Sequence, residues 1–578
     1  MVAFTAAVVS VLCFLTVIAD ASPLKFTSPN RQPQSSGSHQ HLVFPVLSST
    51  DIWCKIPLLS KFLCPRTNAS STVATDTKIG TAKGYLYSTS GVTRYPVKYA
   101  SASRWQASST MSVWDLPYVL NDSDNATALP LACPQTDLNS TDYAEDCLSM
   151  LIYVPPSVTS SSSVPVLVWI HGGSFVIGSA TQAGLDGSDL AVATDSIVVV
   201  LQYRLGALGF MAPDGSTNLA VKDVINALEF LDNTISSFGG DSSMITLAGQ
   251  SSGAGMIRAL LATPSASSYF KSAILQSDPM NFGFLNTSTQ ESMQSYYNDL
   301  VGCSSSDTSC FDALSVSDIL TAETTLYDNA ESIDASAGSA EPIRPVHDGT
   351  LITSALDLTV ASDFPAQTKT ILLSNVKNEA GPTIYGDFTS VLPSSYFDII
   401  TEEMLGDPRA TTVENSSYYT TTAIPASADD ARVSLEVLGT DYMWRCATWS
   451  FAGLWASNGG TAYVGLYTVG ATYPDNEDIP FCADDGGICH EDDIEIVFGT
   501  VSDPTTAQSD LITQVQARYK AFLYDGTPNS GSYTTWTAAT STDINPLNLG
   551  GTDTIETGAC NISFWGDAVE YDYQVYYI

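Results

Sequence analysis

The sequence predicts an α/β protein whose central sheet is mostly parallel and covered by helices on both faces. Two observations support this prediction. From about residue 150 onward, short runs rich in β-branched residues alternate with segments of helical periodicity. The short runs are apolar almost throughout, which is typical of strands buried on both sides. The expected strands are residues 164–170, 196–203, 244–249, 272–277, 370–375 and 462–469.

The segment between the second and third expected strands predicts an amphipathic crossover helix. Its apolar residues recur at helical spacing: Val221, Val224, Ile225, Leu228, Leu231 and Ile235. Three segments are expected to form surface loops, namely residues 155–165, 328–342 and 525–558. These loops interrupt the alternation without dividing it. We therefore expect one large domain with loop insertions at residues 76–578, preceded by an N-terminal extension at residues 22–75.

The first residues predict export. Residues 1–21 form an apolar run of signal-peptide length that ends in Ala19, Asp20 and Ala21, a small-x-small cleavage pattern. No Lys or Arg precedes the run, which leaves a membrane-retained signal anchor as the alternative. We expect a secreted, extracellular protein. In a eukaryotic host it would be a glycoprotein with seven sequons, at Asn68, Asn121, Asn125, Asn139, Asn286, Asn415 and Asn561.

The cysteines predict disulfide bonds. Eleven are present, and Cys13 lies within the expected signal peptide, so ten remain in the mature chain. An even number in an exported chain indicates full pairing. Nearness in sequence suggests four pairs and leaves the last two cysteines for each other: Cys54 with Cys64, Cys133 with Cys147, Cys303 with Cys310, Cys482 with Cys489, and Cys446 with Cys560.

The net charge excludes some classes of partner. A chain with a formal charge of −39 repels phosphates and gains nothing from counterion release, so nucleic acid is not an expected partner. The same charge disfavours anionic membranes, and we expect no stable membrane association. Solubility in an acidic environment explains the charge more simply than substrate steering does. No metal or organic cofactor is implied, and the sequence makes no prediction about oligomeric state.

A serine between two glycines is the candidate nucleophile. GQSSG at residues 249–253 has the form G-x-S-x-G and stands between an expected strand and a helical run. The pentapeptide alone is a weak signal, and an ordinary glycine-rich turn is the alternative. Its context favours a nucleophile, because small neighbours permit a strained turn and a helix N-terminus favours developing negative charge. We therefore predict Ser251 as the nucleophile.

A nucleophilic serine needs a base, and the chain has five histidines. His39 and His41 lie in the polar extension, and His171 begins the turn HGGSF before the serine. His347 lies in RPVHDG, and His490 lies in the loop after the strand at residues 462–469. Where G-x-S-x-G forms a strand-to-helix turn, the triad follows the chain order serine, acid, histidine. This order favours His490 and leaves His347 as the weaker candidate.

Two further features complete a hydrolytic site. The acid that orients the histidine is expected near the carboxyl end of a strand. Glu379 meets this condition because it follows TILLSN, although other carboxylates lie in the same interval. The turn HGGSF follows the first buried strand and is suited to present backbone N–H groups to an oxyanion. Gly173 and Ser174, joined by Ser252 after the nucleophile, are the expected donors.

Several motifs, in one order along the chain, resemble those of the type-B carboxylesterase and lipase family. This family also contains the cholinesterases and the fungal lipases, and the chain is similar to its secreted fungal carboxylesterases. The resemblance covers about Gly80 to Trp565 and implies the α/β-hydrolase fold. Its motifs are AEDCL (144–148), VWIHGGSF (168–175), QYRLGALGF (202–210), FGGDSSMITLAGQSSGAG (238–255), AILQS (273–277) and CHEDDIEIVFG (489–499).

The resemblance implies the same triad and the same three oxyanion donors that the residues suggest. It also implies four roles that spacing does not reveal. These are ion pairs of Arg104 with Glu145 and of Arg204 with Asp223, and support of the triad by Ser277 and Asp493.

Three positions depart from the family pattern. Gln250 stands before the nucleophile where Glu is usual, and Ser252 stands after it where Ala is usual. Ala380 follows the expected acid, where the family usually has Gly directly. None of these departures removes a triad member or a backbone donor.

The segment between Cys133 and Cys147 is expected to correspond to the lid loop of the lipases. It is short and polar, and PQTDLNSTDYAED has almost no apolar face with which to cover a site or dock on lipid. We therefore expect an esterase that acts on small or dissolved acyl esters through an acyl-enzyme. The alternatives are a lipase, sterol esterase or amidase on the same machinery, and a non-catalytic binding or adhesion protein.

Carboxylates surround His490 in the sequence, and two interpretations of them remain open. They either disfavour anionic substrates near the mouth of the site or form a solvated acidic loop. The residues concerned are Asp484, Asp485, Glu491, Asp492 and Asp493.

Overall fold

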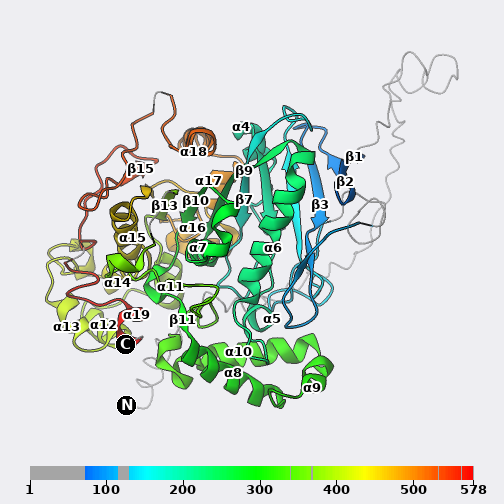
Figure 1. Cartoon of the computed structure of the whole chain (residues 1–578). Coiled ribbons are helices and arrows are strands. Elements are labelled where there is room, and N and C mark those ends of the chain that lie inside the picture. Colours follow the sequence, from blue (N-terminus) through cyan, green and yellow to red (C-terminus); the bar gives the residue numbers. More distant parts are fainter. Residues whose placement is uncertain are drawn as a thin grey trace, which may run out of the picture.

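An eleven-stranded, mostly parallel sheet forms the centre of the molecule (Figure 1). The computed structural model describes residues 72–114, 129–338, 340–365, 369–531, 533–561 and 563–576. The strand order is β1-β2-β3-β6-β8-β7-β9-β10-β13-β14-β15. Neighbouring strands from β1 to β8 in this order are antiparallel, and those from β8 to β15 are parallel. This is the sheet that the sequence predicts, and it is the α/β-hydrolase arrangement.

All six expected strands are present, and the antiparallel edge adds strands that the apolar runs did not indicate. The sheet strands are β1 (Thr72–Thr77), β2 (Gly80–Leu86), β3 (Thr93–Lys98), β6 (Ser149–Val154), β7 (Val164–Ile170), β8 (Ile197–Leu201), β9 (Gly240–Gln250), β10 (Ser272–Gln276), β13 (Thr370–Val376), β14 (Thr461–Tyr467) and β15 (Leu547–Leu549). Two small sheets pair β4 (Ala100–Ser101) with β5 (Ser109–Thr110), and β11 (Leu285–Asn286) with β12 (Val346–His347).

The predicted crossover helix is α6 (Leu219–Thr234). The other α-helices are α4 (Ser188–Thr194), α5 (Gly206–Phe210), α7 (Ser252–Leu261), α8 (Thr287–Val301), α9 (Thr308–Ala313), α10 (Val316–Ile333), α11 (Gly381–Asp387), α12 (Tyr396–Leu405), α13 (Arg409–Glu414), α14 (Ala431–Thr440), α15 (Cys446–Ser457), α16 (Pro480–Ala483), α17 (Ile494–Phe498), α18 (Thr506–Asp525) and α19 (Asp572–Tyr576). Within the described ranges, no helix combines the length and apolar character that a bilayer crossing needs.

Helices cover both faces of the sheet because successive side chains of a strand point to opposite sides. Along β7, Val166 and Val168 join the core beneath α6 and α7, whereas Leu167 and Trp169 join the core beneath α4, α17 and α18. Trp169 meets Phe498 of α17 edge to face, with 4.9 Å between ring centroids. A strand buried on both sides has no polar face, which is why β7 is apolar throughout.

The loop insertions consist of helices that lie outside these layers. Helices α8, α9 and α10 lie together below the sheet in the view of Figure 1, and α8 packs against α10. Helices α12 and α14 pack on each other, and both belong to the segment of the chain between β13 and β14. The insertions extend one domain rather than building a second sheet of comparable size.

The first strand of the sheet begins at Thr72, so the sheet takes in residues that the sequence assigned to the extension before residue 76. Strand β1 pairs with β2 from Thr72 opposite Tyr85 to Thr77 opposite Gly80. The expected signal peptide at residues 1–21, the Cys54–Cys64 pair, His39 and His41 lie outside the described residues.

Four of the five expected disulfides are formed, and they are Cys133–Cys147, Cys303–Cys310, Cys446–Cys560 and Cys482–Cys489. The pair Cys446–Cys560 joins the first residue of α15 to a segment 114 residues later. It therefore links the C-terminal loop to a helix that packs on β14.

Both expected ion pairs are present. Arg204 Nε and Nη2 each lie 2.7 Å from a carboxylate oxygen of Asp223, and the two side chains are 5% and 0% exposed. Arg104 Nε lies 2.8 Å from Glu145 Oε2 in a more exposed setting. The first pair joins α6 to the segment after β8, because Asp223 lies on α6 and Arg204 just beyond that strand.

Replacing Asp223 with alanine is expected to lower the free energy of unfolding by about 3–5 kcal/mol, because it leaves the buried Arg204 guanidinium without its counter-ion. Urea denaturation of the two proteins measures this difference. Lys520→Ala is the matched control, since the Lys520 and Asp195 side chains are 42% and 47% exposed. Breaking that pair is expected to cost less than about 1 kcal/mol. Equal losses in both variants would contradict the prediction.

Candidate active site

Ser251 occupies a strained turn between β9 and α7. Its backbone has φ 54° and ψ −129°, a conformation that residues with a side chain rarely adopt. Its N–H donates to the carbonyl of Gln276 at 2.9 Å, and its carbonyl accepts from Gly255 N at 3.0 Å. The turn is thus held from the neighbouring strand β10 and from the first turn of α7. Ser251 is only 4% exposed.

The glycines on either side of Ser251 are required by close packing. A Cβ on Gly249 would lie 2.8 Å from the carbonyl oxygen of Ile170. A Cβ on Gly253 would lie 2.2 Å from the same oxygen. Both distances are too short for any side chain, so the end of β7 and the turn around Ser251 approach each other through glycine alone. The pattern G-x-S-x-G therefore has a steric cause in this fold.

The turn at residues 171–178 follows β7 and lies against the serine, since a Cβ on Gly172 would lie 3.2 Å from the Cβ of Ser251. Gly173, Ser174 and Phe175 have φ values of 106°, 50° and 63°. Val176 N and Ile177 N both donate to the carbonyl of Gly173, at 3.0 and 2.9 Å. Among the described residues, no acceptor receives the N–H of Gly173 or Ser174. These two N–H groups are therefore free to donate to a further acceptor.

The side chain of Ser252 joins this turn to α7. Its Oγ accepts the N–H of Phe175 at 3.1 Å. Alanine, which is usual at this position in the resembling family, has no atom to make this bond. The departure at Ser252 is thus compensated by an added contact that helps to fix the glycine turn relative to the nucleophile. Residue 252 also begins α7, so its own N–H has no acceptor within the helix.

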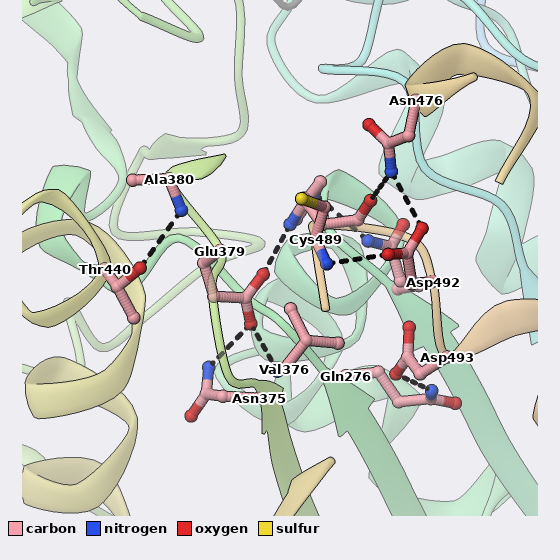
Figure 2. A network of polar contacts seen from close by, with 12 residues as sticks. Gln276, Asn375, Val376, Glu379, Ala380, Thr440, Asn476, Cys489, Asp492 and Asp493 are labelled. Carbon is pink, nitrogen blue, oxygen red and sulfur yellow. Dashed lines mark hydrogen bonds and ion pairs between the residues drawn. The ribbon is translucent and has the colours of Figure 1, made fainter. Parts of the chain in front are cut away.

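Glu379 and His490 are joined by a hydrogen bond, although 111 residues separate them in sequence. His490 Nδ1 lies 2.7 Å from Glu379 Oε2. The other carboxylate oxygen of Glu379 accepts from Val376 N at 2.9 Å and from the Asn375 amide at 3.3 Å (Figure 2). These contacts leave one oxygen of Glu379 to orient the imidazole. Glu379 lies just after β13 and His490 in the loop after β14, as the sequence predicts.

Two kinds of electrostatic effect act on the pKa of His490 in opposite directions. Burial acts to lower the pKa of its imidazole, because a charged ring is poorly solvated there. The hydrogen bond and the negative charge of Glu379 raise the pKa, and the charges of Glu491 and Asp493 add to this effect. The raising contributions prevail, and the pKa of His490 lies above its ordinary value.

The loops that carry Glu379 and His490 are bonded directly to each other. Asn378 N donates to the carbonyl of Ile488 at 2.8 Å, and Ile488 N donates to the Asn378 side-chain oxygen at 3.1 Å. The amide of Asn378 in turn donates to Glu436 on α14 at 3.0 Å. Glu379 and His490 are therefore fixed by one shared network rather than by two independent loops.

Helix α14 also explains why alanine is accepted after Glu379. The N–H of Ala380 donates to Thr440 Oγ1 at 3.1 Å (Figure 2). A Cβ on Gly439 would lie 2.8 Å from the Cβ of Ala380. The methyl group of Ala380 thus occupies space that a side chain at residue 439 would need, and glycine at 439 leaves that space free.

Asp492 holds the loop of His490 in place. It accepts from Cys489 N at 2.7 Å, from the amide of Asn476 at 2.9 Å and from Tyr473 N at 2.9 Å (Figure 2). Asn476 also donates to the carbonyl of His490 at 2.8 Å. Asp492 and Asp493 are buried and hydrogen-bonded, whereas Asp484 and Asp485 are exposed. The acidic run is thus only partly solvated, and two of its members are structural.

Asp493 and Ser277 are placed differently from each other. Asp493 is buried and accepts a hydrogen bond from the side chain of Gln276 (Figure 2). Ser277 has φ 51°, and its Oγ is buried with no hydrogen-bond partner among the described residues. The bond to Asp493 therefore comes from the residue before Ser277. No local sequence pattern indicates this role of Gln276, because its partner lies 217 residues away.

The other two described histidines, His171 and His347, form no hydrogen bond with Ser251. His171 is buried and stacks on Tyr203 with 4.7 Å between ring centroids. Burial lowers the pKa of His171 to about 4, so this ring stays neutral in mildly acidic solution. His347 belongs to the short strand β12 and lines a surface pocket of about 360 Å³ with Asn286 and Tyr573.

One group of possible metal ligands occurs in the described part of the chain, consisting of Asp441, Cys446 and Cys560. The two cysteines form a disulfide, so neither sulfur is a thiolate that could bind a metal ion. This group does not fit a metal site.

A family model described as the carboxylesterase family matches residues 70–565. The chain belongs to this family. The match takes in every strand of the central sheet and every helix named above except α19. It also confirms the resemblance that the sequence motifs indicated.

Relatives of this carboxylesterase-family chain match it over part of their length. A cAMP-regulated protein of Dictyostelium discoideum is 32% identical over 311 residues, 52% of this chain and 55% of that protein. The para-nitrobenzyl esterase of Bacillus subtilis is 42% identical over 173 residues, 28% of this chain and 35% of that protein. A probable N-octanoylanthranilate hydrolase of Rhodococcus erythropolis is 30% identical over 363 residues, 62% of this chain and 70% of that protein. The matched region thus spans about half or less of the first two relatives.

Solved structures agree with the fold over a longer stretch. A PNB esterase superimposes with a TM-score of 0.65 at 25% sequence identity, covering 82% of this chain and 95% of that chain. A thermophilic PNB esterase gives a TM-score of 0.66 at 24% identity over the same shares. Both confirm the α/β-hydrolase fold.

Several buried carboxyl groups have pKa values far above their ordinary range. Burial is the main cause in each case, and it raises the pKa of Glu491 to about 8 and that of Asp492 to about 7. It also raises the pKa values of Glu323 and Glu436 to about 7. A raised pKa means that the folded protein binds the proton more tightly than the unfolded chain. The resulting stability is fully present below about pH 4 and is lost as the pH rises through 7 to 8.

We therefore expect the protein to unfold at a lower temperature and a lower urea concentration at pH 8 than at pH 5. Repulsion within a chain of charge −39 acts in the same direction, so a variant is needed to isolate one carboxyl group. Glu323→Gln removes a titrating group but keeps a side-chain oxygen that can accept the N–H of Ala207. In the wild-type protein, Ala207 N lies 2.7 Å from Glu323 Oε2.

This variant is expected to reduce the loss of unfolding free energy between pH 5 and pH 8 by on the order of 2 kcal/mol. Equal stability of the wild-type protein at the two pH values would contradict the prediction.

Proposed function

We propose that the protein is a serine carboxylic-ester hydrolase in which Ser251 is the nucleophile, His490 the base and Glu379 the acid that orients it. The observation that supports this most strongly is the 2.7 Å contact between His490 Nδ1 and Glu379 Oε2, beside a serine held in a strained strand-to-helix turn. Membership of the carboxylesterase family points to the same chemistry.

The proposed reaction has two steps. Oγ of Ser251 attacks the ester carbonyl carbon while His490 Nε2 takes the hydroxyl proton. The bond from that carbon to the alcohol oxygen then breaks, and His490 returns the proton to the leaving alcohol. In the second step, water attacks the acyl-enzyme with His490 again as base, and Ser251 regains its proton. The carboxylic acid leaves.

The N–H groups of Gly173, Ser174 and Ser252 are the proposed oxyanion donors. Backbone donors of this kind stabilise the negative charge that develops on the carbonyl oxygen, and they require no reorganisation if the turn is already fixed. The bond from Phe175 N to Ser252 Oγ supports such a fixed turn. All groups in this proposal are side chains and backbone groups of the chain itself.

An esterase is favoured over a lidded lipase because the Cys133–Cys147 loop is fastened to the body of the protein. Gln135 donates to the carbonyl of Gly178 at 2.9 Å and accepts from Gly178 N at 2.9 Å. Gln202 donates to the carbonyl of Cys147 at 2.9 Å. The loop ends in Glu145 and Asp146, which pair with Arg104 and Lys98. A loop fastened at both ends is a poor lid.

Small or dissolved acyl esters are the proposed substrates. The solved and curated relatives include para-nitrobenzyl esterases, which are named for a small aromatic ester. One relative is named for hydrolysis of an N-acyl anthranilate, so an acyl amide belongs in any substrate panel. The assembled Ser251, Glu379 and His490 set disfavours a non-catalytic binding protein.

We also propose that the protein is exported and glycosylated. The four disulfides support an oxidising compartment, since such bonds rarely persist in the cytosol. The sequons at Asn139 and Asn415 are exposed, and those at Asn286 and Asn561 are half-buried at the surface, so each is reachable.

A fluorescent organophosphonate is expected to label the protein at one site per chain, and Ser251→Ala is expected to abolish both the label and the ester hydrolysis. The physical reason is that only an activated serine forms the phosphonyl bond. Mass spectrometry of the intact protein measures the stoichiometry. Ser243→Ala is the matched control, because Ser243 lies exposed at the other end of the same strand, β9. Labelling that survives Ser251→Ala would overturn the assignment of the nucleophile.

Hydrolysis of a sparingly soluble ester is expected to follow saturation below its solubility limit, with no jump when droplets form. A fastened polar loop has nothing to open on an interface. The measurement is initial rate against ester concentration across the solubility limit, using a short-chain and a long-chain ester. Activity that rises sharply only above that limit would instead indicate a lipase.

A further inference from the structure

The proposed base contacts Gln250 in the resting protein. The side-chain Nε2 of Gln250 lies 3.0 Å from Nε2 of His490. Within the described part of the chain, no hydrogen bond reaches the Oγ of Ser251. The nitrogen that must take the serine proton is thus engaged by the residue that precedes the serine.

The direction of this contact follows from the other ring nitrogen. An ionised carboxylate only accepts hydrogen bonds, so the 2.7 Å contact with Glu379 places a hydrogen on Nδ1 of His490. In the neutral ring, Nε2 then carries a lone pair, and it accepts from the amide of Gln250. This is the same lone pair that Ser251 needs in the first step of the proposed reaction.

Close packing against the glycine turn holds the amide of Gln250. A Cβ on Gly172 would lie 2.9 Å from Oε1 and 2.9 Å from the main-chain oxygen of Gln250. Glycine at 172 therefore leaves the space that this side chain fills. Oε1 is buried and has no hydrogen-bond partner among the described residues. The amide thus has one polar contact, and that contact is with the base.

We propose that Gln250 is a positioning residue for His490: its amide N–H group occupies the lone pair of Nε2 in the resting protein, so that the ring is kept oriented and unprotonated until Ser251 replaces the amide. This proposal rests on the proposed function, because it needs His490 to act as the base. It gives a role to the position where the family usually carries Glu.

The choice of an amide over a carboxylate matters because negative charge already faces the imidazole. The ring of Trp444 lies beside the imidazole, with 5.3 Å between the two ring centroids. A further carboxylate 3.0 Å from Nε2 would favour the imidazolium form and raise the pKa of the ring, so that less of the protein would hold a base able to take a proton at a given pH. The carboxyl groups that act on the ring electrostatically come from the loop after β13, from its own loop and from the segment before β12, and they are Glu379, Glu491, Asp493 and Glu341.

Two variants of residue 250 separate this role from a merely structural one. Gln250→Glu places a negative charge at the same distance with the same side-chain length. Gln250→Met keeps the length but removes the donor. The measurement is kcat/KM for a neutral, soluble ester from acidic to alkaline pH, and the acid limb of this profile reports the protonation of the free base.

In Gln250→Glu, the acid limb is expected to move up by about one pH unit, so kcat/KM on that limb falls about tenfold. In Gln250→Met, it is expected to move up by about half a unit, a loss of roughly threefold, because the neutral ring loses its donor but gains no opposing charge. Gln294→Met is the matched control. Gln294 is a buried glutamine on α8 that donates to Asn298 of the same helix, and its replacement is expected to leave the limb in place.

Thermal unfolding of each variant shows whether it is folded at every pH used. Acid limbs that coincide with the wild type in both Gln250 variants would overturn the proposal, since a structural defect lowers the rate at all pH values without moving the limb. Failure of the proposed function is recognised separately, by organophosphonate labelling that does not depend on Ser251. Labelling that requires Ser251, together with unmoved limbs, overturns only the role of Gln250.

Discussion

The backbone of Ser251 is held at φ 54° and ψ −129°, and the geometry of the site depends on the contacts that keep it there. Strand β10 supplies the carbonyl of Gln276, and α7 supplies the N–H of Gly255. Gly249 and Gly253 allow the end of β7 to approach within a distance that no Cβ permits. Three elements meet at this turn, so tertiary contacts, and not the turn alone, hold Ser251 in its strained backbone conformation. The same approach brings the glycine turn after β7 against the serine, where Ser252 bonds to Phe175.

A second constraint is the buried polar network that joins the loops of Glu379 and His490. Asn378 and Asp492 satisfy backbone groups that would otherwise be buried without partners, and Glu436 accepts from the side-chain amide of Asn378. These bonds fix the distance between the acid and the base. Burying so many carboxyl groups raises their pKa values, as it does for Asp492 and Glu436. The network is therefore most stable where these groups are protonated.

The Cys133–Cys147 loop links the outer surface of the protein to its proposed chemistry. Gln135 bonds to both polar groups of Gly178, at the end of the turn that carries the expected oxyanion donors. A loop that stabilises this turn cannot also swing away from it without disturbing the site. The short polar sequence and the contacts of the loop thus both support the proposal that access to the serine does not depend on opening a lid.

The sequence by itself determined the parallel sheet and the crossover helix α6, because each follows from a pattern in neighbouring residues. It also suggested Ser251, Glu379 and His490 as a triad, through their order along the chain and the family resemblance. A run apolar on both faces, such as Val164–Ile170, has no stable place except a buried strand. Strand β1 was missed since TVATDT alternates between exposed and half-buried positions at the sheet edge and carries no apolar run. Only the tertiary structure decided that Gln250 meets His490 across 240 residues and that Gln276, rather than Ser277, bonds to Asp493. Such polar contacts depend on where distant loops converge, and no local pattern in one sequence records their partners.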